Sequence, residues 1–233
     1  MKNKFRICSL ITIGSLLVLM NSCEKDDDVR LQFNPDLIYG TATDIDGNVY
    51  KTITIGTQTW MAENLKVSRF NDGTVIPLFY EYWGEDTPGP SYYWVKDNPI
   101  TYKNIYGALY NWYAVNTGKL CPAGWHIPTI SEWTTLVNYL GGDSIAGGKI
   151  KESGTKHWEY PNLGATNESG FTALPSDYIC GFDYVPGREC EFWSSTECVN
   201  TYAWMLLIEI NSSKIYWNIS GAAAQFPVRC IKD

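Results

Sequence analysis

The sequence has few basic residues and almost no histidine. Its 233 residues include 18 Lys and Arg against 25 Asp and Glu, which gives a formal net charge of −7, and it has only two histidines. Lys and Arg form no cluster beyond the first few residues. Proteins that bind nucleic acid need a basic face that neutralises phosphates. The composition therefore argues against nucleic-acid binding and favours neutral or cationic partners.

Metal-binding and catalytic motifs are also missing. The sequence has no C-x-x-C pair, and His126 and His157 alone do not supply the ligand spacing of a zinc site. It has no recognisable set of Ser, His and Asp and no glycine loop that would cradle a phosphate. We therefore expect no metal and no cofactor.

A long apolar run occurs only once, at the N-terminus. Lys2, Lys4 and Arg6 precede an apolar stretch over residues 7–20, which is the layout of a secretory signal. No later segment reaches the roughly 18 apolar residues that a membrane-spanning helix requires. The sequence predicts that residues 1–22 are removed on export.

The end of this run, Asn21-Ser22-Cys23, resembles the lipobox of bacterial lipoproteins. The resemblance implies that Cys23 is lipidated and becomes the first residue of the mature chain, although Asn21 is a less usual residue at its position. Several acyl chains anchor a protein stably, at about 0.8 kcal/mol per buried methylene. An ordinary signal peptide followed by a chance cysteine is the alternative.

An acidic run, Glu24-Lys25-Asp26-Asp27-Asp28, follows the lipobox and is similar to the tether that sends Bacteroidetes lipoproteins to the outer face of the outer membrane. A plain solvated linker is the alternative. We expect a signal peptide over 1–22, an acidic tether over 23–37 and one domain over 38–233, lipid-anchored in the outer membrane and facing the cell exterior. The signal carries three basic and no acidic residues, so its removal moves the net charge from −7 to about −10.

Hydrophobic alternation predicts strands towards both ends of the domain. Val49, Ile53 and Ile55, around a turn at Asp46-Gly47, indicate a β-hairpin over residues 39–55. Residues 71–98 are rich in Pro, Gly and aromatic residues and are predicted to form a long loop. The further predicted extended segments are 58–62, 171–174, 192–195, 203–210, 214–219 and 226–231.

Two main helices are expected in the middle of the domain. Residues 104–115 place their apolar side chains on one helical face. Thr129-Ile130-Ser131-Glu132 is a capping box, and it begins a helix that ends at Gly141-Gly142. Residues 144–151 predict a short additional helix. Central helices with strands from both ends of the chain indicate an α+β domain whose sheet joins its termini.

Six motifs occur in an order that is typical of one protein family. They are Asp44-Ile45-Asp46-Gly47-Asn48-Val49-Tyr50, Trp60-Met61-Ala62-Glu63-Asn64-Leu65, Tyr106-Gly107-Ala108-Leu109-Tyr110-Asn111-Trp112-Tyr113-Ala114-Val115, Cys121-Pro122-Ala123-Gly124-Trp125-His126-Ile127-Pro128, Trp193-Ser194-Ser195-Thr196-Glu197 and Val228-Arg229-Cys230. Together they resemble the Fibrobacter succinogenes major paralogous domain over about residues 40–232. That family occurs largely in exported proteins and lipoproteins of Bacteroidetes and Fibrobacteres, and its activity is undefined.

The segment from Ile127 to Trp133, together with Arg229-Cys230, is also similar to sulfatase-modifying-factor domains. This resemblance implies a C-type-lectin-like fold, with a twisted antiparallel sheet, two main helices and long irregular loops. It implies a disulfide between Cys121 and Cys230 that closes the domain. Cys180 and Cys190 are candidates for a second bridge, in the segment that corresponds to the lectin long loop. Five cysteines follow the anchor, so one is left unpaired or intermolecular.

Aromatic residues supply the candidate binding site. Ten Trp and sixteen Tyr are present, and both residue types combine a large apolar face with a polar group. If exposed, they could stack on sugar rings or contact a protein partner; if buried, they form the small core of their own loop. The candidate ligand-binding residues are Tyr82, Trp83, Tyr92, Tyr93, Trp94 and Tyr184.

Carboxylates offer the main enzymatic alternative. Glu63 and Glu197 lie in the family motifs, and a pair of carboxylates could support glycoside hydrolysis, although carboxylates that hold loops by accepting backbone hydrogen bonds are commoner. His126 is expected to anchor a loop. Asp44, Asp46 and Asn48 resemble the start of a calcium-binding EF-hand loop, but the glycine is misplaced and the final Glu is absent, which favours a hairpin turn.

A formylglycine-generating oxidase is a further alternative, because its chemistry uses cysteines on a C-type-lectin-like fold. Those enzymes place two cysteines close together near the C-terminal end, whereas a whole predicted hairpin separates Cys198 from Cys230. No catalytic residue is therefore assigned. We expect a non-enzymatic surface module that binds a glycan or an envelope or extracellular protein, with an extracellular glycan-active enzyme as the alternative.

Overall fold

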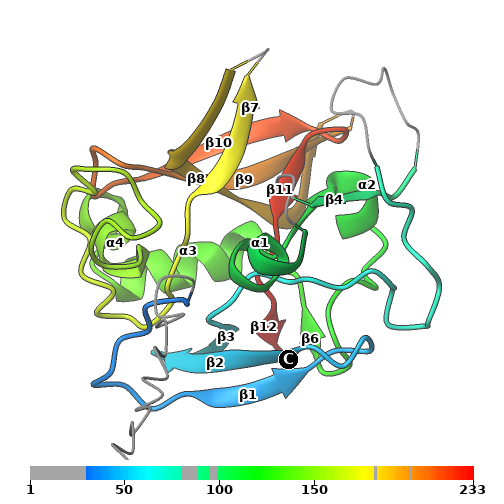
Figure 1. Cartoon of the computed structure of the whole chain (residues 1–233), viewed down its shortest axis with the longest axis horizontal. Helices are drawn as coiled ribbons and strands as arrows, with labels where there is room; N and C mark the ends of the chain where they lie inside the picture. Colours follow the sequence, from blue (N-terminus) through cyan, green and yellow to red (C-terminus); the bar gives the residue numbers. More distant parts are fainter. Residues whose placement is uncertain (1–29, 80–88, 95–98, 181–182, 200) are drawn as a thin grey trace, which may run out of the picture.

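The computed structural model describes residues 30–79, 89–94, 99–180, 183–199 and 201–233. Figure 1 shows one sheet at the bottom of the view, a second sheet at the top, and the helices between them. The chain is therefore a mixed α+β domain, as predicted. In the described part of the chain, none of the helices has the length and apolar character needed to cross a membrane.

The lower sheet contains strands from both ends of the domain. In spatial order it consists of β1 (Gly40–Thr43), β2 (Val49–Ile55), β3 (Gln58–Met61), β12 (Ile231–Lys232) and β6 (Trp125–His126). The predicted hairpin of β1 and β2 is confirmed, and Gly47 in its turn has a φ of 82°, which glycine adopts without steric cost. The prediction that the sheet joins the two ends of the domain is also confirmed, because β12 pairs with β3.

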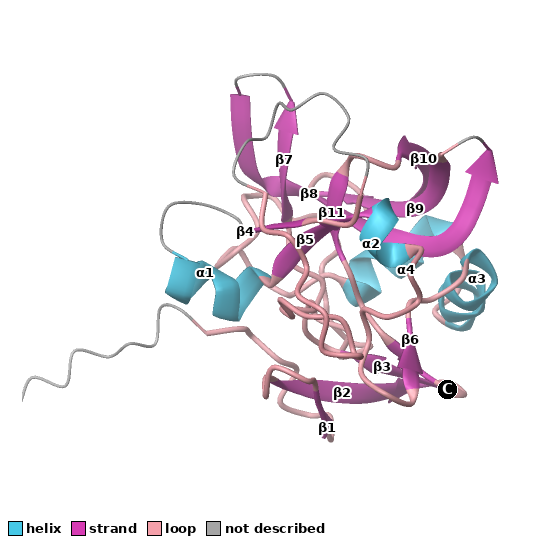
Figure 2. Cartoon of the chain, turned by 90° about the vertical axis from the view of Figure 1, so that its right-hand side faces the viewer, coloured by secondary structure: helices cyan, strands magenta, loops and turns pink. Residues whose placement is uncertain are grey.

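The upper sheet is curled and antiparallel (Figure 2). Its spatial order is β10 (Ile215–Gly221), β9 (Tyr202–Glu209), β8 (Asp183–Val199) and β7 (Ser176–Cys180). The sheet separates two hydrophobic cores, because successive strand side chains point to opposite faces. Leu206 and Ile208 of β9 enter one core, whereas Ala203 and Met205 enter the other.

The helix predicted over residues 104–115 is wrong. The segment contains the end of α1 (Pro99–Tyr106), then β5 (Ala108–Asn111) and the short α2 (Trp112–Val115). Gly107 breaks the helix with a φ of 73°, and a Cβ there would lie 2.7 Å from Leu65 O. All four residues of β5 are buried, and periodicity alone does not distinguish a short, fully buried strand from a helix.

β5 lies in the middle of a small third sheet. β4 (Tyr92–Trp94) pairs on one side of it and β11 (Gln225–Pro227) on the other. The predicted strand over 226–231 is thus divided between β11 and β12. The residues between them include Arg229, whose buried side chain donates hydrogen bonds to the Asn64 side chain and to three backbone carbonyls. The predicted strand at 171–174 is a buried loop that makes a single bridge, from Ala173 to Lys151.

The capped helix is confirmed as α3 (Ile130–Tyr139). The Thr129 side chain accepts a hydrogen bond from Glu132 N, and the Glu132 side chain accepts one from Thr129 N at 2.8 Å. Trp133, Leu136 and Val137 form its buried face, which packs on the core beneath the upper sheet. The predicted short helix follows as α4 (Asp143–Ile150).

Residues 31–37, which the sequence assigns to the tether, pack against the domain. We call this segment the N-terminal strap. Phe33 and Leu37 contact the core beneath the upper sheet, and Gln32 N donates a hydrogen bond of 2.7 Å to the buried carboxylate of Glu152. The packed part of the chain therefore begins before residue 38.

Candidate functional site

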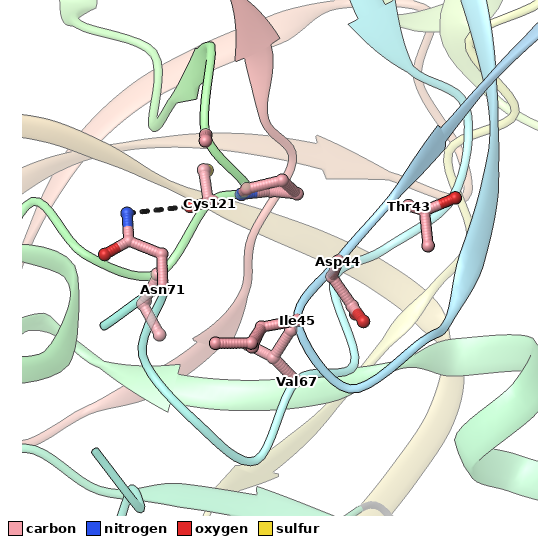
Figure 3. Close-up of a pocket in the computed structure, with 9 residues that line it drawn as sticks. Thr43, Asp44, Ile45, Val67, Asn71 and Cys121 are labelled. Atoms are coloured by element: carbon pink, nitrogen blue, oxygen red, sulfur yellow. Dashed lines mark hydrogen bonds between the residues drawn. The ribbon is translucent and has the colours of Figure 1, made fainter. Parts of the chain in front are cut away.

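A surface pocket lies between the β1–β2 turn and the loop that leads into β6 (Figure 3). Its volume is about 530 Å³. Apolar side chains form most of its wall, and the polar side chains are those of Thr43, Asp44 and Asn71. The lining residues are Thr43, Asp44, Ile45, Val67, Asn71, Leu120, Cys121, Pro122 and Ala123.

The carboxylate of Asp44 is fully occupied by neighbouring groups. One oxygen accepts a hydrogen bond from Asn48 N at 2.9 Å, and the other accepts bonds from Asn48 Nδ2 at 2.8 Å and from the Tyr50 hydroxyl. Burial of Tyr50, together with its proximity to Tyr110 and Asp44, raises its pKa well above the ordinary tyrosine value. Tyr50 therefore stays protonated and Asp44 holds the hairpin turn, which confirms the turn interpretation of this motif.

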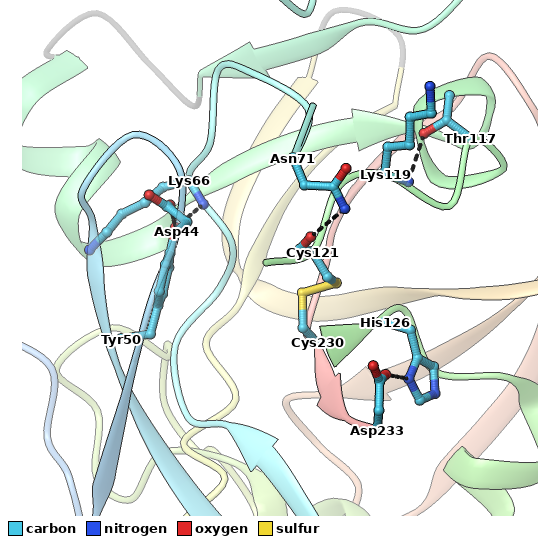
Figure 4. The surroundings of a disulfide bond; sticks show 10 residues. All are labelled: Asp44, Tyr50, Lys66, Asn71, Thr117, Lys119, Cys121, His126, Cys230 and Asp233. Atoms are coloured by element: carbon cyan, nitrogen blue, oxygen red, sulfur yellow. Dashed lines mark hydrogen bonds and ion pairs between the residues drawn. A yellow bond between two sulfur atoms is a disulfide. The ribbon is translucent and has the colours of Figure 1, made fainter. Parts of the chain in front are cut away.

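Cys121, which lines the pocket, belongs to a disulfide (Figure 4). Cys121 and Cys230 are bonded, with their Cα atoms 6.0 Å apart and 109 residues apart in sequence, so the expected closing bridge is confirmed. Asn71 holds the same loop, because its Nδ2 donates to Cys121 O at 3.2 Å and its backbone N–H donates to Lys119 O. The pocket can accommodate an apolar group, but its carboxylate serves the fold.

The predicted aromatic site is only partly accessible. Tyr92 is 7% exposed and packs in the core, with its ring 5.2 Å from that of Trp94 and 6.3 Å from that of Tyr110. It is therefore a core residue, which corrects its assignment to the binding site. Tyr93 and Trp94 are half-buried, and Lys103 Nζ lies 4.6 Å from the Trp94 ring centroid.

Other predicted residues lie outside the described part of the chain. These are Cys23, Tyr82 and Trp83. Tyr184 pairs with Ile179 in the β7–β8 hairpin, but its side chain is not among those described. The second disulfide is a wrong prediction, because Cys190 is a free, buried thiol. Cys180 stands opposite Asp183 near the hairpin turn, whereas Cys190 stands opposite Ile208 further along β8.

Of the candidate catalytic groups, Glu63 and His126 have structural partners. Glu63 Oε1 accepts a hydrogen bond of 2.7 Å from Lys51 N, which is the loop-holding role, and Glu197 is exposed on β8. His126 bonds to Asp233 through Nδ1 and to Glu132 through Nε2, so its expected role as a loop anchor is confirmed. Partial burial lowers the pKa of His126, but these two hydrogen bonds outweigh that effect and raise the pKa above its ordinary value.

A second surface, at one end of the upper sheet, was missed by the sequence analysis. We call it the sheet patch. Tyr202 pairs with Val199 and Gly221, and Trp204 pairs with Ile219, so these side chains share one face of the sheet. Trp217 continues the same face. The members of the patch are Val199, Tyr202, Trp204, Trp217 and Ile219.

The sheet patch extends a buried face beyond the helices that cover it. Leu206 and Ile208 lie on the same face and are fully buried beneath α3 and α4, whereas Tyr202 is 46%, Val199 53% and Ile219 40% exposed. Trp204 and Trp217 are half-buried. The apolar alternation of residues 202–208 and 215–219 is the sequence signal that could have revealed this surface. It indicates one continuous apolar face, but it does not show where the helices stop.

The chain matches one family model, that of the Fibrobacter succinogenes major domain, over residues 53–232. The match includes the sheet patch and both disulfide cysteines, and it leaves out β1 and the first residues of β2. None of the curated proteins and none of the solved structures in the comparison matches the chain.

Proposed function

This chain belongs to the Fibrobacter succinogenes major domain family, and we propose that it is a non-catalytic binding module displayed on the cell surface. In this proposal Cys23 carries a lipid anchor in the outer membrane, and the domain faces the cell exterior. The proposal includes a C-type-lectin-like arrangement of the domain. The pairing of β12 with β3, which joins the two ends of the domain, and the Cys121–Cys230 bridge, which ties the C-terminal end to the loop before β6, support that arrangement.

The sheet patch is the observation that carries the proposed function. Protein interfaces are enriched in Tyr and Trp, and contiguous exposed apolar surface is rare on proteins that have no partner. Strands hold the side chains of the patch in fixed positions, so that binding would cost little conformational entropy. Aromatic faces could also stack on sugar rings, but Val199 and Ile219 offer no hydrogen bond to a hydroxyl. A protein of the envelope or the extracellular medium is therefore the favoured partner, with a glycan as the alternative.

The test compares the mature chain, made soluble by Cys23→Ser, with a Tyr202→Ala/Trp204→Ala variant. Both proteins are applied to a glycan array and to purified envelope and secreted proteins of the organism that makes this chain. The affinity is then measured for each ligand found. The control is Tyr139→Ala/Tyr160→Ala, which removes two aromatic side chains, 66% and 86% exposed, from outside the patch.

We expect saturable binding of at least one ligand, with an affinity that falls at least tenfold in the patch variant and is unchanged in the control. Loss of protein binding identifies a protein partner, and loss of sugar binding identifies a glycan. Equal affinity for the patch variant and the unmodified protein would rule out the patch as the binding surface.

A further inference from the structure

The N-terminal strap is held to the domain by hydrogen bonds along its length. Gln32 N donates to Glu152 Oε1 at 2.7 Å, and Gln32 O accepts from Asn167 Nδ2 at 3.3 Å. Asn34 Nδ2 donates to Asn167 O at 3.1 Å, and Asn34 N donates to the Tyr39 hydroxyl at 3.2 Å. Glu152 is itself fixed by His157 Nδ1 at 2.7 Å, so the strap is bound to a buried, pre-positioned carboxylate.

Side-chain packing reinforces these hydrogen bonds. The Phe33 ring packs edge-on against Tyr39 at 5.3 Å, and Lys51 Nζ lies 4.2 Å from the Phe33 ring centroid. Leu37 fits over Gly170, where an added Cβ would lie 2.7 Å from Leu37 Cδ1. Gly170 thus leaves the space that the strap occupies. The strap is an integral part of the domain surface.

The docked strap limits the length of chain between the proposed anchor at Cys23 and the domain. If Cys23 carries the proposed anchor, Leu31 lies eight positions further along the chain, and at about 3.6 Å per step the two residues are at most about 29 Å apart. A domain of this size is roughly 40 Å across. Without the strap contacts the tether would run to Tyr39 and reach about 58 Å, which is more than the width of the domain.

The strap and the sheet patch lie on opposite sides of the molecule. In Figure 1 the strap is at the lower left, and the end of β8 that leads into β9 is at the upper right. After the turn of 90° in Figure 2, the two segments are again on opposite sides. Ile38, directly after the strap, is 95% exposed on the strap side, and Arg30 is exposed at its start.

We propose that the docked strap fixes the orientation of the domain on its membrane. The strap side, with Ile38 and Arg30, faces the phospholipid surface, and the sheet patch faces away from it. The partner of the strap side is thus a lipid headgroup layer, which suits an exposed aliphatic side chain beside a cation. This proposal rests on the lipid anchor at Cys23. It explains how a short tether presents a binding surface to the exterior, because the patch cannot reach the membrane while the strap is docked.

The test measures the depth of two positions in the lipidated full chain, reconstituted in phosphatidylethanolamine and phosphatidylglycerol vesicles. Ile38→Cys and Ile219→Cys are each made with Cys180→Ser and Cys198→Ser, and each is labelled with an environment-sensitive fluorophore. Quenching is measured with a nitroxide on the lipid headgroup, after flotation has shown that the protein is on the vesicles. We expect quenching at position 38 to exceed quenching at position 219 at least threefold.

Two further variants test the role of the strap. Phe33→Ser/Leu37→Ser removes the packed side chains of the strap, and quenching at position 219 should then increase. Pro35→Ser/Asp36→Ser changes two exposed residues of the same segment and should leave both signals unchanged. Flotation with equal quenching at positions 38 and 219 would overturn the orientation and leave the anchor intact. Failure to float would reject the anchor and the orientation together, while loss of ligand binding in the patch variant remains an independent readout of the proposed function.

Discussion

The closure of the lower sheet, where β12 pairs with β3 and Arg229 bonds to Asn64, and the sheet patch of the upper sheet use their side chains in opposite ways. At the closure the buried side chains of Arg229 and Asn64 form hydrogen bonds within the chain. Arg229 is fully buried and donates four hydrogen bonds, the shortest to Asn64 Oδ1 at 2.5 Å, and its guanidinium lies 4.7 Å from the Phe171 ring. At the patch, large apolar side chains remain in contact with solvent.

This difference shows which region specifies the fold and which is available for a partner. Leaving a buried donor or acceptor without a partner costs about 1–3 kcal/mol, so the groups around Arg229 constrain one another. At the patch, Trp217 donates one hydrogen bond to Asp143, but Tyr202, Val199 and Ile219 are 40–53% exposed. We therefore expect changes at the closure to reduce stability and changes at the patch to reduce binding.

The largest effect on stability is expected from removing the disulfide. Cys121→Ala/Cys230→Ala opens a loop of 109 residues, and the chain-entropy model gives a loss of about 4–5 kcal/mol in the free energy of unfolding. Urea denaturation of the two proteins measures the loss. Cys198→Ala, at an exposed thiol, is the control and should change stability by less than about 0.5 kcal/mol. A double variant as stable as the control would show that the closure does not hold the domain together.

The second largest effect on stability is expected from Glu191, a buried carboxyl group on the face of the upper sheet opposite the patch. Burial, and then the nearby Glu189, raise the pKa of Glu191 from 4.5 to about 7, despite a hydrogen bond from Ser176 that acts in the other direction. The folded state therefore binds a proton that the unfolded state has lost between these two values. The stabilisation is complete below pH 4.5 and is lost as the pH rises through 7, with a total of about 3 kcal/mol.

Glu191→Gln mimics the protonated carboxyl and should remove this pH dependence. Unfolding free energies of the variant and the unmodified protein should agree near pH 4.5, and the variant should be the more stable by about 3 kcal/mol at pH 8. Glu197→Gln changes an exposed carboxylate on the same strand and serves as the control. A constant difference between pH 4.5 and 8 would contradict the assignment of a raised pKa to Glu191.

The smallest effect on stability is expected at the patch. Tyr202→Ala/Ile219→Ser changes two side chains that are 46% and 40% exposed, and together they should alter the unfolding free energy by about 1 kcal/mol or less. Thermal unfolding checks this expectation. A loss of several kcal/mol would mean that the patch is part of the core, and the contrast between the two regions would disappear.

The sequence predicted those elements whose signals are local. The capping box at Thr129 and Glu132 places hydrogen-bonding groups at fixed spacing, and α3 begins where the motif indicates. The β1–β2 turn is similarly defined by Asp44, Gly47 and Asn48. Local residues determine where these elements begin or turn, so distant contacts were not needed to predict them.

The errors occurred where distant segments decide the structure. Residues 108–111 form a strand because β4 and β11 pair with them on both sides, and β11 lies more than 110 residues away in sequence. Tyr92 is buried by the same sheet. Cys190 remains a free thiol because its position on β8 lies opposite Ile208, a register that the spacing of cysteines does not reveal. The sheet patch was missed for the same reason, since its exposure depends on where α3 and α4 end.

The position of β12 inside the lower sheet limits the order in which the domain can be assembled. β12 lies between β3 and β6, and its pairing of Ile231 with Trp60 joins residues about 170 positions apart. A chain that crosses a membrane with its N-terminus leading exposes β1, β2 and β3 long before β12 follows, so this hairpin region has an open edge during translocation. Non-local pairing of this kind slows folding and prolongs the exposure of unpaired strands. If the chain is exported as we propose, a chaperone or rapid translocation would have to protect the edge of β3 until the last strand arrives.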